Sequence, residues 1–111
     1  MTRFQPGDKV ATLFNQEHYY GALDEKSAAS GLGGVYDGTL RQYGVFSEHG
    51  LVKLPDNLTW EEGGTLTCAG VTAWNALYGL RPLKPGQWVL SQGTGGVSTF
   101  ALKVNKRSLQ R

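Results

Sequence analysis

The sequence has 111 residues, 40% hydrophobic and 18% charged, which excludes a chain disordered by composition and fits one ordinary domain or less. Its net charge of +2 is too small to indicate a nucleic-acid or membrane-surface partner. No apolar run approaches the ~20 residues of a membrane span. The N-terminal segment lacks the shape of a signal peptide, and the single cysteine excludes an internal disulfide. We therefore expect a cytoplasmic protein.

The first part of the sequence predicts a small, irregular β domain. A Pro-Gly turn opens the β-rich run 6–14, and the polar, glycine-rich residues 15–38 have no clean period, which predicts a long loop. Alternating apolar residues then predict strands over 39–46 and 51–54, and Pro55 ends the second of them.

Helical patterns dominate the second part. Thr59 and Glu62 match a capping box, so a helix should begin there, although Gly63 and Gly64 weaken it. The apolar spacing of residues 69–80 predicts a stronger helix. The expected apolar face of that helix consists of Val71, Trp74, Leu77 and Tyr78.

A strand, a glycine-rich turn and a second helix complete the predicted order. We expect the strand at Trp88–Leu90, the turn at Gly93–Gly96, and the helix from Val97 to about Lys106. A dinucleotide-binding unit begins in this way, because glycines let a pyrophosphate approach the main chain and the helix N-terminus binds it. Ser98 stands where that motif has its third glycine, and the motif predicts for it only a small packing residue.

Two features that accompany such a unit are missing. A βαβ unit takes roughly 30 residues, and 23 remain from Val89 onward. The acidic residue that binds the ribose about 20 residues after the motif is absent, because residues 109–111 (LQR) occupy that place.

Charge is distributed unevenly along the chain. All nine acidic residues lie between Asp8 and Glu62, and the six basic residues after Gly63 have no acidic residue among them. Two interpretations remain open. Either the compensating acidic residues belong to a segment that the chain lacks, or a basic surface meets the phosphates of a cofactor.

Cys68 has three possible roles, as a metal ligand, a nucleophile or a core residue. A zinc site needs several Cys, His or carboxylate ligands, and the two histidines, His18 and His49, are not suggestively spaced. A lone cysteine before an apolar helix is more often buried. We therefore expect Cys68 in the core and His18 exposed on its loop.

Taken together, these stretches resemble the medium-chain dehydrogenase/reductase superfamily, which includes the zinc-type alcohol dehydrogenases and the quinone oxidoreductases. The combination TAWNAL, then KPG, then the glycine turn is specific to this family. The matching stretches are FQPGDKV at 4–10, DGTLRQYGVFSEHGLVKLPDNLTWEE at 37–62, TLTCAGVTAWNALYGLRPLKPGQWVLSQGTGGVS at 65–98 and FALK at 100–103.

The resemblance implies an α+β to α/β fragment that is truncated at both ends. Residues 1–66 would be the latter part of a GroES-like catalytic domain. Residues 67–111 would be the first helix, strand and helix of a Rossmann cofactor-binding domain. After Lys103 the ending VNKRSLQR departs from the family pattern, as a shifted reading frame, a retained intron or a degraded gene copy would.

The resemblance also implies site residues. Thr72 would face the nicotinamide as the catalytic contact. Cys68 matches the third catalytic zinc ligand of the alcohol dehydrogenases, but the other ligands and the four-cysteine lobe are missing, so zinc is not expected. The cofactor would be NAD or NADP, with NADP preferred. Its binding residues would be Gly93, Thr94, Gly95, Gly96, Val97 and Thr72.

The implied function is hydride transfer between NAD(P) and a small alcohol, carbonyl or enone. A small-molecule substrate and a homo-oligomeric full-length relative are expected, with no nucleic acid and no membrane among the partners. The alternative is a catalytically inactive product that docks on a full-length relative or is degraded. Binding of NADPH by this chain favours the first hypothesis, and an aggregated chain without such binding favours the second.

Overall fold

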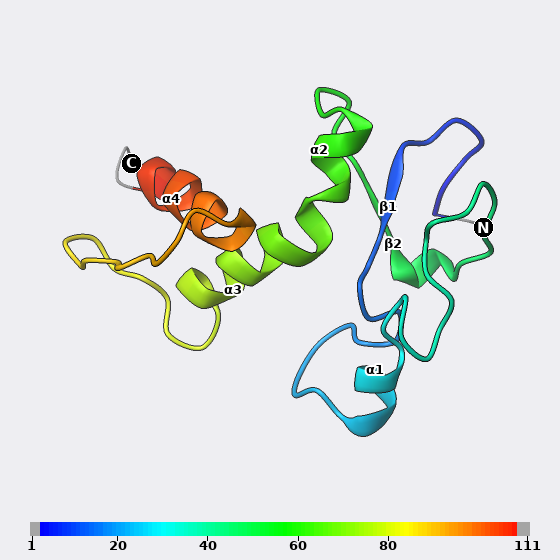
Figure 1. Cartoon of the computed structure of the whole chain (residues 1–111), viewed down its shortest axis with the longest axis horizontal. Helices are drawn as coiled ribbons and strands as arrows, with labels where there is room; N and C mark the ends of the chain where they lie inside the picture. Colours follow the sequence, from blue (N-terminus) through cyan, green and yellow to red (C-terminus); the bar gives the residue numbers. More distant parts are fainter. Residues whose placement is uncertain (1–2, 109–111) are drawn as a thin grey trace. The chain divides into compact units, whose positions relative to one another are not determined.

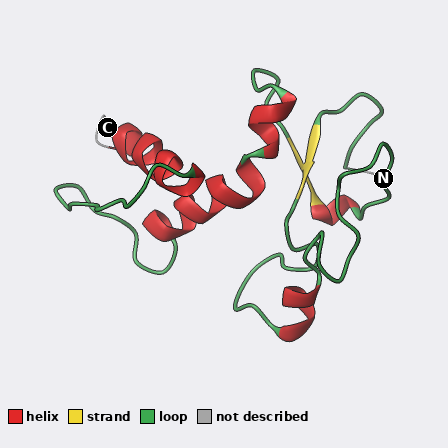
Figure 2. Cartoon of the chain, in the orientation of Figure 1, coloured by secondary structure: helices red, strands yellow, loops and turns green. Residues whose placement is uncertain are grey.

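The computed structural model describes residues 3–108, in a chain that divides into two compact units, Met1–Gly63 and Gly64–Arg111. Figure 1 labels the helices and the two strands, and Figure 2 shows the long loops that join them. This mixture of helices with a small sheet agrees with the coarse α and β content that the sequence predicts.

Two short antiparallel strands form the sheet of the first unit. β1 (Val10–Thr12) pairs with β2 (Leu51–Lys53), with Val10 opposite Lys53. The pairing confirms the strands predicted at both places. Because a two-stranded ribbon is only marginally stable by itself, other contacts must hold it in place.

Buried polar side chains supply those contacts. Gln16 is buried, and its Nε2 donates to the Gly50 carbonyl at 3.2 Å, next to the start of β2. Ser30 is 1% exposed; its Oγ donates to the Ser27 carbonyl at 2.6 Å and accepts from the Glu17 N–H at 3.0 Å. Hydrogen bonds between loop segments therefore stabilise the first unit, as a large apolar core stabilises other domains.

The segment predicted to be one long loop contains a short helix, α1 (Glu25–Ala29). Its N-cap is Asp24, whose Oδ1 accepts from the Ser27 N–H at 2.7 Å. The prediction of an unbroken loop over 15–38 is wrong here, because one capped turn is too short to produce a helical period in the sequence.

The strand predicted over 39–46 is also wrong, since the structure has a loop there. Leu40, Tyr43 and Val45 are 106%, 90% and 97% exposed, so neither face of the alternating pattern is covered. A strand needs a neighbour to bond its N–H and C=O groups, and the described sheet contains only β1 and β2.

α2 (Trp60–Gly64) begins at the predicted capping box. The Glu62 N–H donates to Thr59 Oγ1 at 3.2 Å, and the Thr59 N–H donates to the Glu62 carboxylate at 2.9 Å. This reciprocal pair confirms the predicted start. The helix ends after its two glycines, which lower helix propensity.

In the second unit, α3 (Val71–Tyr78) follows a π-helical turn (Leu66–Gly70) and packs against α4 (Gly96–Ser108) (Figure 1). Both helices confirm the sequence prediction. Gly79 ends α3 as expected, and its N–H donates to the Asn75 carbonyl at 2.8 Å.

The buried face of α3 is not the predicted one. Ala73 and Leu77, four residues apart, are 0% and 6% exposed, whereas Val71 and Trp74 are more than half exposed. The prediction was wrong for Val71 and Trp74, because it weighted large apolar side chains. Neighbouring elements pack closely against the small side chain of Ala73 and bury it completely.

The strand predicted at Trp88–Leu90 is absent, and these residues are irregular. Trp88 is 99% exposed and Leu90 is 86% exposed. The reason is the same as for residues 39–46, since no neighbouring strand is present among the described residues of this unit.

Gly63 and Gly64 give a matched test of packing around α2. A Cβ on Gly63 would collide with Cδ1 of the buried Leu54, whereas a Cβ on Gly64 would meet no atom within 4 Å. We expect Gly63→Ala to lower the free energy of unfolding by about 1–3 kcal/mol through overpacking. We expect Gly64→Ala to raise it by up to about 1 kcal/mol, because alanine favours helix. Urea unfolding followed by circular dichroism measures both, and equal effects would contradict the packing described.

Candidate functional site

The glycine-rich turn before α4 has an open main chain. Gly93 has φ of +83°, a left-handed conformation that glycine adopts without steric cost. No atom lies within 4 Å of a Cβ built on Gly93 or on Gly95. A ligand group can therefore approach the backbone of this turn closely, and a side chain at either position would occupy that space.

The start of α4 presents unpaired main-chain donors. Its first helical hydrogen bond runs from the Thr99 N–H to the Gly95 carbonyl at 3.0 Å. The N–H groups of Gly96, Val97 and Ser98 precede it and have no partner among the described residues. Such N–H groups, together with the helix dipole, favour an anion at this end of the helix.

Hydroxyl groups brace the turn. Ser98 Oγ donates to the Gln92 carbonyl at 2.8 Å, and Thr99 Oγ1 donates to the Thr94 carbonyl at 3.5 Å. The motif alone predicts only a packing role for Ser98, so this contribution was missed. Ser and Thr in the first turn of a helix after a glycine turn are the pattern that indicates it.

The first residue of α4 packs against the π-helical turn that contains Cys68. A Cβ on Gly96 would lie 3.2 Å from the Ala69 Cβ. Thr72, one turn further along, is exposed on α3, and no hydrogen bond joins it to the glycine turn among the described residues. The structure thus brings the glycine turn beside Ala69, while the roles of Thr72 and Cys68 stay predictions.

Cys68 is exposed, so the expectation that it lies in the core is wrong. The expectation rested on the general tendency of lone cysteines to be buried, and this tendency does not determine which side of a particular turn a side chain occupies. Among the described residues no three His, Cys, Asp or Glu side chains gather in a way that would hold a metal ion.

The second unit carries no acidic residue after Gly64, while its sequence includes six basic residues. No carboxylate of this unit therefore opposes a negatively charged ligand at the turn. Lys103 lies on α4, with Nζ 5.9 Å from the centre of the Phe100 ring. The charge balance and the unpaired N–H groups both favour an anion.

No protein-family model matches the chain. It is 47% identical over 102 residues to a zinc-type alcohol dehydrogenase-like protein of Schizosaccharomyces pombe, covering 90% of this chain and 30% of that protein. An alcohol dehydrogenase of Geobacillus stearothermophilus is 40% identical over 70 residues, covering 63% of this chain and 20% of that protein. A probable mannitol dehydrogenase of Mesembryanthemum crystallinum is 38% identical over 76 residues, 64% of this chain and 21% of that protein. These similarities agree with the resemblance of the chain to the medium-chain dehydrogenase/reductase superfamily.

The chain spans between 20% and 30% of the length of these relatives. The S. pombe relative is named zinc-type, which counts against the expectation that zinc plays no part. Within residues 3–108, no helix has both the length and the apolar character that crossing a membrane requires.

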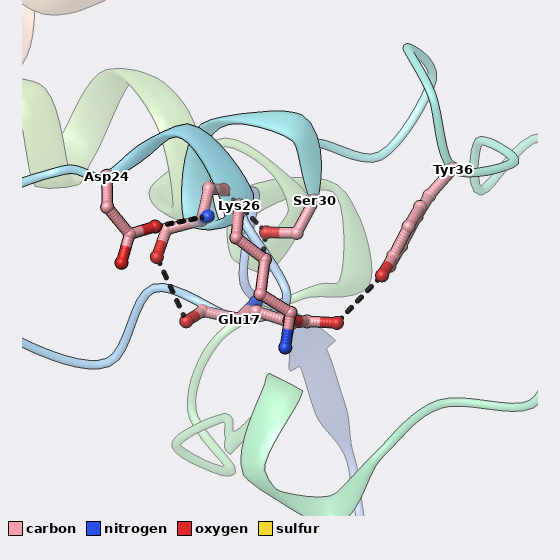
Figure 3. A network of polar contacts seen from close by, with 6 residues as sticks. Glu17, Asp24, Lys26, Ser30 and Tyr36 are labelled. Carbon is pink, nitrogen blue, oxygen red and sulfur yellow. Dashed lines mark hydrogen bonds and ion pairs between the residues drawn. The ribbon is translucent and has the colours of Figure 1, made fainter.

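The first unit of the chain contains a separate polar cluster centred on Glu17 (Figure 3). Tyr36 Oη donates to Glu17 Oε1 at 2.7 Å, and Lys26 Nζ lies 2.7 Å from Glu17 Oε2. His18, expected to be exposed, is half-buried, with Nε2 3.2 Å from the Gly21 carbonyl. The cluster was not predicted, because its members come from separate loop segments and share no motif.

Hydrogen bonds stabilise the charged form of Glu17. The contact with Lys26, and next that with Tyr36, lowers the pKa of the Glu17 carboxyl. The same contacts raise the pKa of Lys26 and of Tyr36. A lowered carboxyl pKa contributes stability above the ordinary value of 4.5, and this contribution is lost as the pH falls through the lowered value.

Tyr36→Phe tests this cluster. Glu17 then loses one hydrogen-bond donor, so its pKa should rise toward the ordinary value of 4.5, and less stability should be lost on acidification. The carboxyl ¹³C chemical shift of Glu17, followed through an acid titration, measures the pKa. Tyr20→Phe is the matched control, since Tyr20 is 89% exposed in the same loop. An unchanged Glu17 midpoint in Tyr36→Phe would show that the hydroxyl does not bind Glu17 in solution.

Proposed function

We propose that Gly93–Val97 binds the pyrophosphate of NAD or NADP, and that the chain is part of an NAD(P)-dependent oxidoreductase of the alcohol dehydrogenase type. One observation carries the proposal. The open main chain at Gly93 and Gly95 is followed directly by three unpaired N–H groups at the start of α4. A pyrophosphate needs both clearance and donors, and the turn offers the two together.

The reaction class follows from the family. When bound, a nicotinamide supplies hydride chemistry toward a small alcohol, carbonyl or enone. In this proposal the chain's own residues bind and orient: the turn anchors the phosphates, and the exposed Thr72 lies against the nicotinamide ring. The cofactor in this proposal is NAD or NADP, with NADP slightly preferred.

In the same proposal, residues 1–66 are the latter part of a GroES-like domain and residues 67–111 open a Rossmann domain. The division of the chain into compact units at Gly63 and Gly64 supports this boundary. The substrate is a small molecule, the location is cytoplasmic, and the full-length form is a homo-oligomer. The proposed reaction does not require zinc, although the zinc-type name of the S. pombe relative favours a zinc-dependent one.

A second candidate function is a catalytically inactive chain that docks on a full-length relative. The second unit exposes large apolar side chains, with Trp74 59%, Leu80 103% and Trp88 99% exposed. Exposed apolar surface of this kind marks interaction sites or favours aggregation. NADPH binding by the isolated chain separates this candidate from the first.

Gly95→Ala tests the cofactor turn, with Gly64→Ala as a matched control. In the structure a Cβ at either position meets no atom within 4 Å, so neither change strains the free chain by collision. Only a ligand that approaches the turn collides with the new methyl group at residue 95. We expect NADPH affinity to fall about tenfold in Gly95→Ala, which corresponds to about 1.4 kcal/mol, and to stay unchanged in Gly64→Ala.

Isothermal titration calorimetry with NADPH and NADH, on chains shown to be folded by circular dichroism, measures these affinities. Equal affinities of Gly95→Ala and the unmodified chain would contradict the placement of the pyrophosphate. A folded chain that binds neither nucleotide would contradict the cofactor proposal and favour the docking candidate.

A further inference from the structure

An open hollow of about 920 Å³ lies in the first unit, formed entirely by residues between Gln16 and Ser47. Pockets that bind small molecules measure about 300–1,000 Å³. The hollow belongs to the loops around α1 and contains none of the residues proposed to bind NAD(P). A ligand site here would therefore be additional to the cofactor turn.

Part of the lining is apolar and uncovered. Tyr19, Val35 and Val45 line the hollow and are 53%, 77% and 97% exposed. Burial of such apolar side chains away from water would be favourable. The apolar body of a small ligand would cover them.

Most charged groups of the lining already have partners. Glu17 is bonded to Lys26 and Tyr36, and Asp24 caps α1 through the Ser27 N–H. The contacts of these charged groups stabilise the loops around α1. The remaining charged side chains of the lining are Asp37 and Arg41.

Arg41 lies over a ring and forms a long ion pair, which leaves its N–H groups without a hydrogen bond to any described residue. Its guanidinium carbon lies 5.3 Å from the centre of the Phe46 ring, and Nη1 lies 3.8 Å from Asp37 Oδ2, beyond hydrogen-bond distance. Among the described residues the guanidinium forms no hydrogen bond. The Asp37 side chain is 93% exposed, so water already solvates it and it competes weakly for Arg41.

We propose that this hollow binds a small apolar carboxylate, with the carboxylate on Arg41 and the apolar body against Tyr19, Val35 and Val45. A guanidinium over a ring presents a planar pair of N–H groups that matches a carboxylate. A phosphate fits less well, because its second negative charge would face Asp37 and Glu17. An apolar ammonium is disfavoured by the positive charge of the guanidinium.

Benzoate is the probe, and its neutral analogue benzamide is the comparison. We expect benzoate, added to the ¹⁵N-labelled full chain, to give saturable ¹H–¹⁵N shifts confined to residues 16–47. Benzamide should bind at least tenfold more weakly, since it keeps the ring and loses the charge. Equal binding of the two compounds, or shifts that do not saturate, would overturn the proposal.

Variants of the charged pair sharpen the test. Arg41→Gln should abolish benzoate binding, because the positive charge is lost. Arg41→Lys should weaken it, because lysine keeps the charge but lacks the two parallel N–H groups of the guanidinium. Asp37→Asn should tighten it severalfold, since the competing carboxylate is gone. Arg81→Gln, at an exposed position in the second unit, is the control and should change nothing. Undiminished benzoate affinity in Arg41→Gln, with an otherwise native spectrum, would refute the site, as would weaker binding in Asp37→Asn.

Discussion

The approach of Gly96 to Ala69 is the contact on which the candidate cofactor turn depends. A side chain on Gly96 would crowd the Ala69 methyl group at 3.2 Å, so only a residue without Cβ lets α4 start here without a shift. That start determines where the first N–H groups of α4 point, and the Ser98 hydroxyl ties the same turn back to Gln92. Close packing of small residues thus positions the N-terminus of α4, whose N–H groups and dipole favour an anion without a charged side chain.

The first unit is stabilised mainly by buried hydrogen bonds and not by the packing of small residues. Its buried side chains include Gln16, Ser27 and Ser30, and Leu54 is the apolar one among them. Buried polar groups stabilise a fold only when they are hydrogen-bonded, and no buried side-chain atom among the described residues lacks a partner. This network fixes the loop that carries the Glu17 cluster and shapes the hollow beside it.

Local patterns in the sequence predicted local structure well, whereas of the predicted strands, which need a distant partner, two formed and two did not. The capping box at Thr59 and Glu62 and the helix over Gly96–Ser108 depend on neighbours in the chain, so the sequence suffices for them. The strands predicted over 39–46 and 88–90 needed a second strand that the described residues do not supply. The Glu17 cluster and the position of the Arg41 guanidinium arise from loop geometry, for which the sequence carries no period or motif.

Binding of a dinucleotide and turnover of a substrate make different demands on this chain. Phosphate recognition is local, because the turn and the first N–H groups of α4 lie within Gly93–Ser98 and need no distant residue. Hydride transfer instead requires ring and substrate to be held within a fraction of an ångström by a supported site. The chain spans 30% of the S. pombe relative, and its exposed Thr72 has no hydrogen-bond support from the turn among the described residues. Cofactor binding and catalysis therefore make separate demands, and the proposed phosphate contacts are the part that lies within the described residues.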